Sequence, residues 1–464
     1  MMLYLVVKEA RALVRDGRLL TLVAAMLALC VGVLWVAHTE RERQRAEKQA
    51  IETATRAQWD EQGDKHPHRG AHFGMYVFAP ESTLAAFDPG IQSQVGQALY
   101  LEPHRRNVSR FNSVIDDPFA GRLGEFTPAF VLIAILPLLI VTAAHGTIAG
   151  ERDTGVLRMV RGTGVDLRRI VGSKVVALGV AIATLIALIF GVLVGLSDEP
   201  ERTAALFFAY LIYASIFVCI GVAISAVTRT SREALVAAIA VWLVAVWIVP
   251  RVGAAIADAS IELPTPDAFW SAIRRDYQQG LPGDGDLDAR SRAFDQQLLT
   301  QHGVARLEDL PFGAYAVRRL NRDRYADRVY ALHFDALWER LAQQEATLRS
   351  ASVFSPAIAM RLLSMKLAGT DLSHRKAFED AAELYRREFN AYIDDWDAKS
   401  TSGLRSFEDK YANNSLWRST ARFEHRPPSA GEALRNASTE VGMLLAWATA
   451  ALVLLAWASS RVKL

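Results

Sequence analysis

Six long stretches of this 464-residue chain contain no aspartate, glutamate, lysine or arginine, and they constrain its fold more than any other feature. An α-helix needs roughly 17–25 mostly apolar residues to cross a bilayer. Within hydrocarbon, such a helix satisfies every backbone polar group inside its own segment. We therefore predict a mainly α, polytopic membrane protein with six transmembrane helices. The predicted spans are residues 19–37, 127–149, 175–196, 203–227, 234–250 and 441–460.

Outside these runs, the composition is that of a soluble protein. The whole chain is 51% hydrophobic. The remaining residues, roughly 341, are only about 39% hydrophobic and about 30% charged. This division excludes a water-soluble globular enzyme, and it also excludes a bare helical channel with short loops. Both cysteines, Cys30 and Cys219, lie in apolar runs, which excludes a disulfide framework or a cysteine metal site in the aqueous parts. The net charge of +2 argues against a nucleic-acid partner.

Lysine and arginine are concentrated in the short segments that share one side of the membrane with the termini. Six spans place both termini on the same side. The short loop on the other side, 197–202, reads SDEPER and is acidic. Because basic residues in short loops stay in the cytoplasm, we predict cytoplasmic termini and two extracytoplasmic regions, 38–126 and 251–440. The basic short segments are residues 1–18, 150–174, 228–233 and 461–464.

Residues 1–18 have the pattern of an amphipathic helix that lies on the membrane surface. Lys8, Arg11, Arg15 and Arg18 alternate with apolar positions. The apolar run that follows is longer than a signal-peptide core of about 7–15 residues, and no small-residue cleavage site follows it. We therefore expect a retained first span.

The extracytoplasmic regions are predicted to be largely helical. A charged helix over 40–61 is expected to continue the first span out of the membrane. In the second region, apolar residues recur near 3.6-residue spacing over 323–350 and 377–397. The fifth span is expected to end near Pro250, which is followed by Arg251.

Three histidines of the first extracytoplasmic region form an H-x-H-x3-H pattern. They are His66, His68 and His72, and His104 lies a little further on. Three imidazoles can bind zinc or copper. The stretch is also rich in proline, glycine and aromatic residues, which favours packing within a loop. Both interpretations stay open, with loop packing preferred.

The chain contains no nucleotide-hydrolysing or other hydrolase motif. No G-x-x-x-x-G-K-[ST] sequence occurs, so no P-loop for ATP is present. No G-x-S-x-G or H-E-x-x-H sequence occurs either. We therefore predict that the chain is not itself an enzyme and holds no cofactor.

The segment between the second and third spans, Gly150–Lys174, is the most informative one. Thr154–Val160 is predicted to form a short helix, and Asp166 is placed to cap the helix that becomes the third span. Such a segment is either an ordinary basic loop or a surface helix that receives a partner protein.

These residues make the chain similar to a permease subunit of the type-2 ABC exporter family. The match lies in a G-E-[KR]-[ED]-x-G-T-L pattern followed by G-x-K. Two extracytoplasmic motifs, Ala71–Pro80 and Leu101–Asn107, resemble a branch of that family with two large extracytoplasmic insertions. The matching residues of the loop are Gly150, Glu151, Arg152, Asp153, Gly155, Leu157, Gly172 and Lys174.

The resemblance implies a set of roles for these regions. Residues 1–18 would be the elbow helix, and the loop 150–174 would carry a coupling helix that contacts a separate ATPase subunit. That subunit would bind ATP and Mg²⁺, and a second permease would complete a homodimer or heterodimer in the bacterial inner membrane. The residues implied in ATPase coupling are Glu151, Arg152, Asp153, Gly155, Leu157, Arg158 and Arg161.

Three classes of function are consistent with this pattern. In the first, the complex exports a substrate that the sequence does not name. Alternatively, it moves no cargo and drives a periplasmic or surface protein partner mechanically, which the roughly 190-residue insertion favours. A membrane-anchored receptor or enzyme would have no ATPase partner, and recovery of such a partner would exclude this class.

Overall fold

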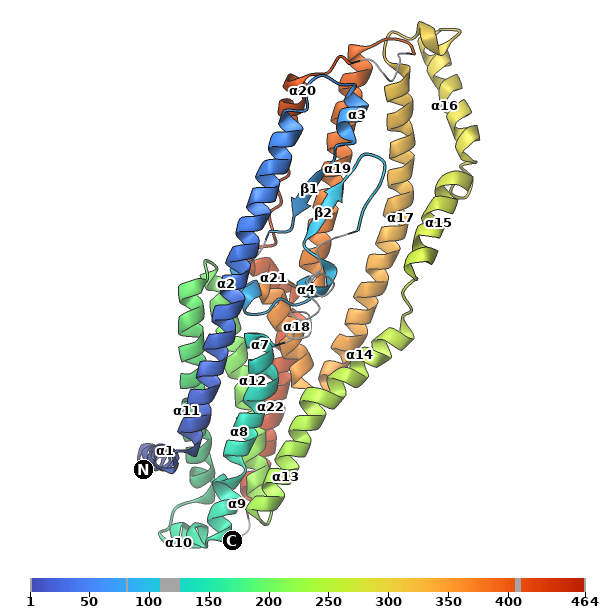
Figure 1. The fold of residues 1–464 in the computed structure, drawn as a ribbon. Coiled ribbons are helices and arrows are strands. Elements are labelled where there is room, and N and C mark those ends of the chain that lie inside the picture. The colour runs from blue at the N-terminus through green and yellow to red at the C-terminus, as the bar shows by residue number, and fades with distance from the viewer. Residues whose placement is uncertain (1, 81, 109–125, 405–409, 463–464) are drawn as a thin grey trace.

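The computed structural model describes residues 2–80, 82–108, 126–404 and 410–462. The molecule is elongated, with a helical bundle at one end and a second group of helices extending away from it (Figure 1). Helices dominate the described residues, which confirms the predicted mainly α class. We call the end of the bundle that holds both termini the basal end, and the part remote from it the outer part.

Among the described residues, six helices are long and apolar enough to cross a membrane, as predicted. All of them extend beyond the uncharged runs at one end or both, because a helix continues wherever its backbone hydrogen bonds are satisfied. These candidate spans are Leu19–Asp60, Pro128–Asp153, Leu167–Leu196, Pro200–Val227, Ser231–Ser260 and Ser438–Ser460.

The first span is the basal half of one uninterrupted helix, α2 (Arg18–Asp60). Its 43 residues correspond to a length of about 65 Å at 1.5 Å per residue. Gly17, with φ of 71°, separates α2 from the amphipathic helix α1 (Met2–Asp16). Figure 1 shows α1 nearly end-on at the base, across the direction of α2. The left-handed backbone of Gly17 makes this sharp change of direction possible.

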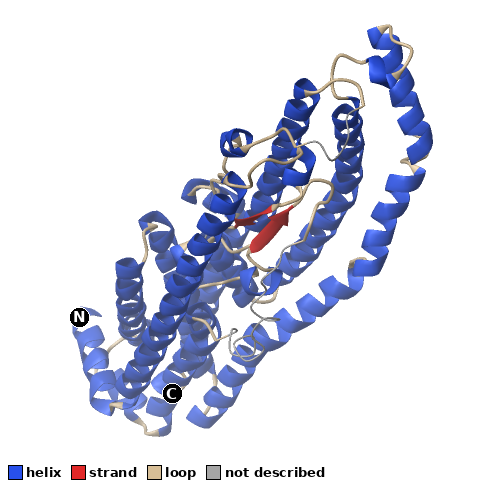
Figure 2. Ribbon diagram, turned by 45° about the horizontal axis from the view of Figure 1, so that its top comes forward, coloured by secondary structure: helices blue, strands red, loops and turns tan. Residues whose placement is uncertain are grey.

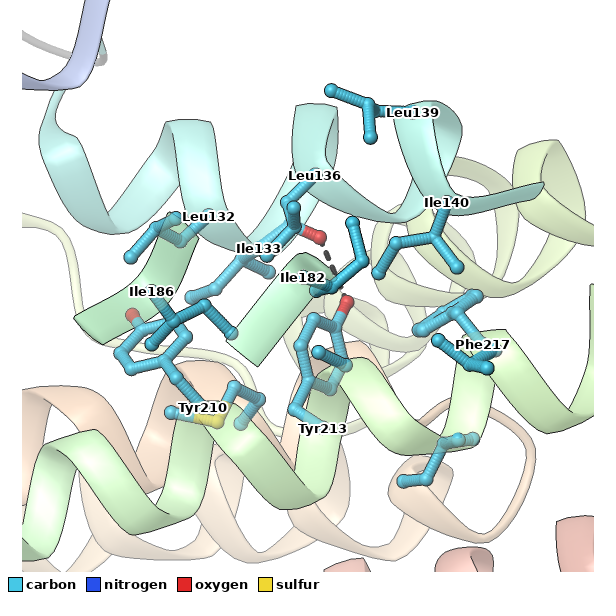
Figure 3. Close-up of a cluster of buried hydrophobic side chains, with 14 of the residues drawn as sticks. Leu132, Ile133, Leu136, Leu139, Ile140, Ile182, Ile186, Tyr210, Tyr213 and Phe217 are labelled. Atoms are coloured by element: carbon cyan, nitrogen blue, oxygen red, sulfur yellow. Dashed lines mark hydrogen bonds between the residues drawn. The ribbon is translucent and has the colours of Figure 1, made fainter. Parts of the chain in front are cut away.

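The bundle is built from the basal half of α2 and the remaining spans around one hydrophobic core, to which α2 contributes Met26, Cys30 and Leu34. Figure 3 shows its centre, where Ile182 and Ile186 meet Tyr210, Tyr213 and Phe217, all under the second span. The helices of the bundle are α7 (Pro128–Phe130), α8 (Leu136–Ala144), α9 (Gly146–Asp153), α11 (Leu167–Leu196), α12 (Pro200–Val227), α13 (Ser231–Trp242), α14 (Val249–Ser260) and α22 (Ser438–Ser460).

A π-helical turn, η2 (Val131–Ile135), accommodates Pro137 in the second span. Pro137 lacks the N–H that would bond to the carbonyl of Ile133 in an α-helix. The hydroxyl of Tyr213 donates to that carbonyl instead, at 2.7 Å (Figure 3). A side chain from the fourth span therefore satisfies the backbone that the proline leaves open.

Replacing Tyr213 by phenylalanine should lower the free energy of unfolding by about 1 kcal/mol, because the buried carbonyl of Ile133 loses its donor. Unfolding in mixed micelles measures this change. Tyr4→Phe, at an exposed tyrosine of α1, is the matched control and should have no effect. An equal stability of the Tyr213→Phe protein would show that the hydroxyl contributes nothing.

The expectation that the helix of the fifth span ends near Pro250 is wrong. The helix passes through a second π-helical turn, η3 (Leu243–Ile248), and continues as α14 to Ser260. Pro250 lies in the first turn of α14, where the missing N–H removes no α-helical bond. The proline therefore shifts the hydrogen-bond register and does not terminate the helix.

The outer part is mostly helical, and its two longest helices contain the two predicted periodic stretches. A two-stranded antiparallel sheet, visible between helices in Figure 2, was not predicted. Its strands β1 (Met75–Phe78) and β2 (Ala98–Leu101) pair with Met75 opposite Leu101. The outer helices are α3 (Pro67–Ala71), α4 (Gln92–Val95), α15 (Pro266–Gln279), α16 (Leu287–His302), α17 (Ala314–Ser350), α18 (Pro356–Ala368), α19 (Leu372–Ser400), α20 (Asn414–Ser419) and α21 (Ala430–Asn436), with short 3-10 turns at Thr83–Ala86, Leu307–Asp309 and Ala351–Val353.

Helix α18 joins the outer part to the bundle. Every residue of α18 except Arg361 is buried, and the helix packs against α12 and α22. The Ser364 hydroxyl lies 3.1 Å from the Tyr210 hydroxyl of α12. It also donates, at 2.5 Å, to the carboxylate of Asp88, which belongs to the outer residues between the first and second spans. One helix thus connects both outer regions to the spans.

The far end of α2 is also fixed to the outer part. Trp59, which is fully buried, donates its indole N–H to the carbonyl of Trp417 at 2.9 Å. Around it, a second hydrophobic core combines residues of the small sheet with Phe378 and Ile393 of α19. Both ends of α2 are therefore held by tertiary contacts.

Candidate functional site

The loop between the second and third spans forms a short helix at the basal end. Helix α10 (Val156–Gly162) follows α9 after a turn at Gly155, which has φ of 75°. The predicted helix began two residues earlier, at Thr154, but that residue closes α9. Asp166 is the N-cap residue of α11, although its side chain makes no capping bond among the described contacts.

Helix α10 has one buried face and one exposed face. Leu157 is 1% exposed and belongs to the bundle core. Met159 is 67% exposed, and Arg158 and Arg161 are exposed as well. The helix is therefore anchored by a leucine and presents two guanidinium groups and a methionine at the base of the molecule.

Glu151 does not share that exposed face. Its carboxylate accepts from the Lys174 ammonium at 2.8 Å, and the same ammonium donates to Glu9 of α1 at 2.8 Å. The Lys174 side chain is only 4% exposed. Burial raises the pKa of the Glu9 carboxyl, but the ammonium groups of Lys174 and Lys8 together outweigh burial and leave that pKa below its usual value. We call Glu9, Lys174 and Glu151 the basal ion trio.

Arg152 and Asp153 also bond to neighbouring helices, although Asp153 itself is exposed. The Arg152 guanidinium donates to the carbonyls of Ala226, at 2.8 Å, and Thr228, at the end of α12. Asp153 accepts from the backbone N–H of Ser231 at 2.9 Å, at the start of α13. These two residues fix the loop that joins the fourth and fifth spans.

The seven residues implied in coupling therefore fall into three groups. Glu151, Arg152 and Asp153 hold α9 against its neighbours, while Gly155 and Leu157 shape and anchor α10. Arg158 and Arg161 reach the surface. The sequence reasoning missed Met159, which extends the exposed face, and Glu9, whose partner is 165 residues away. A lone glutamate among the basic residues of the elbow helix is the one signal that pointed to Glu9.

The outer histidines are divided by the structure as well. His66 caps α3, because its Nδ1 accepts from the backbone N–H of His68. His72 lies beside His68, and His104 joins them from the turn after β2. The predicted set of His66, His68 and His72 is therefore not the set that converges. Burial, followed by the charge of Arg319, lowers the pKa of His68 to about 2, and burial lowers the pKa of His72.

Two family models match adjacent parts of the chain. Residues 105–269 match the ABC-2 family transporter protein, and residues 268–426 match a domain of unknown function, DUF3526. The first covers the second to fifth spans with α10, and the second covers most of the outer part. No curated protein and no solved structure gave a match.

Proposed function

We propose that this chain is the permease subunit of an ABC transporter and couples ATP hydrolysis by a separate ATPase subunit to export. The match of residues 105–269 to the ABC-2 family transporter protein supports the permease assignment. Permeases of this family associate with an ABC ATPase subunit, and the ABC-2 domain is not itself an ATPase. ATP and Mg²⁺ would bind to that partner. The proposed complex contains two permease and two ATPase subunits in the bacterial inner membrane.

The observation that carries this proposal is the exposed face of α10. A helix that is anchored by Leu157 and presents Arg158, Met159 and Arg161 has the form of a docking element. It lies at the same end of the molecule as both termini (Figure 1). With the basic short segments at that end, the proposed orientation places α10 in the cytoplasm, where ATP is available.

Membrane lipid and a second permease would cover the apolar surface of the bundle. On α1, Leu3, Tyr4 and Val7 are exposed beside basic residues, as in a helix lying at the headgroup level. The fifth span also exposes apolar side chains along its length. They are Val236, Ile239, Val241, Leu243, Val244, Ile248, Val252 and Ile256.

Two features favour a mechanical output as the second candidate. The interior of the single bundle is closely packed (Figure 3), so an export path would lie between two permeases. Meanwhile α2 and α18 connect the bundle directly to the outer part. In this alternative, movement at α10 would be transmitted to a periplasmic or surface partner and no cargo would cross. ATP-driven cargo accumulation in proteoliposomes would support export, and ATP turnover without it would support the mechanical output.

Replacing both Arg158 and Arg161 by glutamate should reduce the amount of copurifying ATPase about tenfold or more, because like charges then meet across the docking surface. Pull-down from native membranes, with the partner identified by mass spectrometry, measures this change. Arg168→Glu with Arg169→Glu repeats the charge change on exposed residues of α11 and should keep the ATPase bound. Normal assembly and ATP turnover of the α10 variant would contradict the proposed docking site.

A further inference from the structure

Three imidazoles converge in the outer part, at a distance from the proposed docking surface. The Nε2 atoms of His72 and His104 lie 3.1 Å and 3.3 Å from the Nε2 of His68. One ring nitrogen of each lies within 4.8 Å of the others. Tetrahedral zinc bound to imidazole at about 2.0–2.1 Å holds its ligand nitrogens roughly 3.3 Å apart. The two distances from His68 are therefore close to those of a formed site, and the ligand nitrogens of His72 and His104 lie within 4.8 Å of each other.

His104 is held in the tautomer that a metal requires. Its Nδ1 lies 2.8 Å from a carboxylate oxygen of Asp323, on α17. Because the carboxylate accepts, the proton stays on Nδ1 and the lone pair of Nε2 points at the other two rings. A carboxylate behind a ligating histidine is the usual outer-shell arrangement at metal sites.

The contacts among the three rings are poorly explained as hydrogen bonds alone. A single Nε2 position of His68 faces both His72 and His104. A neutral ring offers one hydrogen or one lone pair at that atom. Since His104 presents a lone pair, one hydrogen on His68 would have to serve both contacts. A cation at the centre satisfies all three nitrogens together.

A cavity of about 320 Å³ borders the cluster. Its wall includes His68, His104 and Asp323, together with Tyr277 and Arg322. A zinc ion held by three histidines keeps one coordination position for water or another ligand. The cavity supplies room for that fourth ligand.

We propose that His68, His72 and His104 bind a zinc ion, with Asp323 orienting His104 and the fourth position open to the cavity. The ion would join the first extracytoplasmic region, which supplies the three ligands, to α17 of the second region through Asp323. This site does not depend on the ATPase partner, so either proposal can fail without the other.

Zinc titration of the full-length protein tests this proposal. The protein is purified in detergent through a tag without histidine, stripped with a chelator, desalted and titrated with ZnCl₂ in a calorimeter. We expect one zinc per chain. His72→Gln, at an exposed residue, and His104→Gln should weaken binding at least 100-fold, and Asp323→Asn should weaken it about 10–100-fold.

His302→Gln is the matched control, because His302 is an exposed outer histidine on α16 that lies outside the cluster. This variant should bind zinc as the parent protein does. Thermal unfolding provides a second readout, in which zinc should raise the melting temperature of the parent and of His302→Gln but not of His72→Gln. Absence of zinc binding by the parent, or equal binding by His72→Gln, would overturn the proposal. Because Cu²⁺ binds imidazole ligands more tightly than Zn²⁺ at almost any site, metal analysis of the protein purified without added metal or chelator identifies the ion. Another metal in place of zinc would overturn the assignment to zinc.

Discussion

Replacing Lys174 by methionine will destabilise the basal end by about 2–3 kcal/mol, because two partly buried carboxylates then lose their only shared cation among the described contacts. Lys174 pairs with Glu9 of α1 and Glu151 of α9, and its own side chain is 4% exposed. Without the ammonium, the two carboxylates repel each other in a region from which most water is excluded. We expect α1 to separate from α11 before the spans themselves unfold.

Unfolding in mixed micelles, together with a disulfide cross-link engineered between α1 and α11, measures this effect. Arg11→Met is the matched control, because Arg11 is an exposed basic residue of α1 outside the basal ion trio, and it should change stability little. Adding Glu9→Gln and Glu151→Gln to Lys174→Met should recover much of the loss, since no charge remains buried. A Lys174→Met protein as stable as the parent would show that the basal ion trio does not hold α1.

Pull-down of the ATPase with the Glu151→Gln protein, compared with its unfolding in mixed micelles, separates two roles for Glu151. If Glu151 contacts the ATPase directly, Glu151→Gln should reduce ATPase binding as strongly as changes on α10. If it acts through the basal ion trio, as its contacts indicate, ATPase binding should fall only as far as stability does.

Replacing Glu440 by alanine should cost about 3–5 kcal/mol at the junction between the spans and the outer part. Its side chain is 0% exposed. One carboxylate oxygen accepts from Lys366 of α18 and from Arg349 of α17, both at 2.7 Å. Removal of Glu440 would leave the Lys366 ammonium buried beside the start of the sixth span. The carbonyl of Asn436 would then be its remaining described partner.

Loss of this contact should also loosen the outer part from the bundle. Limited proteolysis of the outer part and unfolding in mixed micelles measure the two effects. Glu339→Ala removes an exposed glutamate of α17 and should change neither. In the double variant Glu440→Ala with Lys366→Met, stability should recover, since neither of the two charges is left buried. Unchanged proteolysis of Glu440→Ala would show that the other contacts of α18 hold the junction without Glu440.

Much of the bundle could be predicted because its signals are local. A run such as Val175–Leu196 states its own environment, and the 3.6-residue period of 323–350 states which side of the helix is buried. The segment Gly150–Lys174 was recognisable for a similar reason, since Gly155 and the residues around it form a short contiguous pattern. Family comparison supports the same region of the chain.

Other features had no local signal. The small sheet was missed because each strand has four residues, which is too short for a period to emerge. Pro250 was taken as a helix end, although a π-helical turn before it absorbs the missing hydrogen bond. Helix α18 was not predicted either, because its place inside the bundle depends on the turn that returns it from α17.

The sequence by itself determined that this chain is a six-span membrane protein with a large aqueous part, because insertion into hydrocarbon is decided residue by residue along each segment. The tertiary structure alone decided which charged and imidazole groups meet. Lys174 lies between acids 165 and 23 residues away, and His104 meets an aspartate 219 residues away. Such pairs form because the fold buries them together and a buried polar group requires a partner. No periodicity in the chain records that requirement.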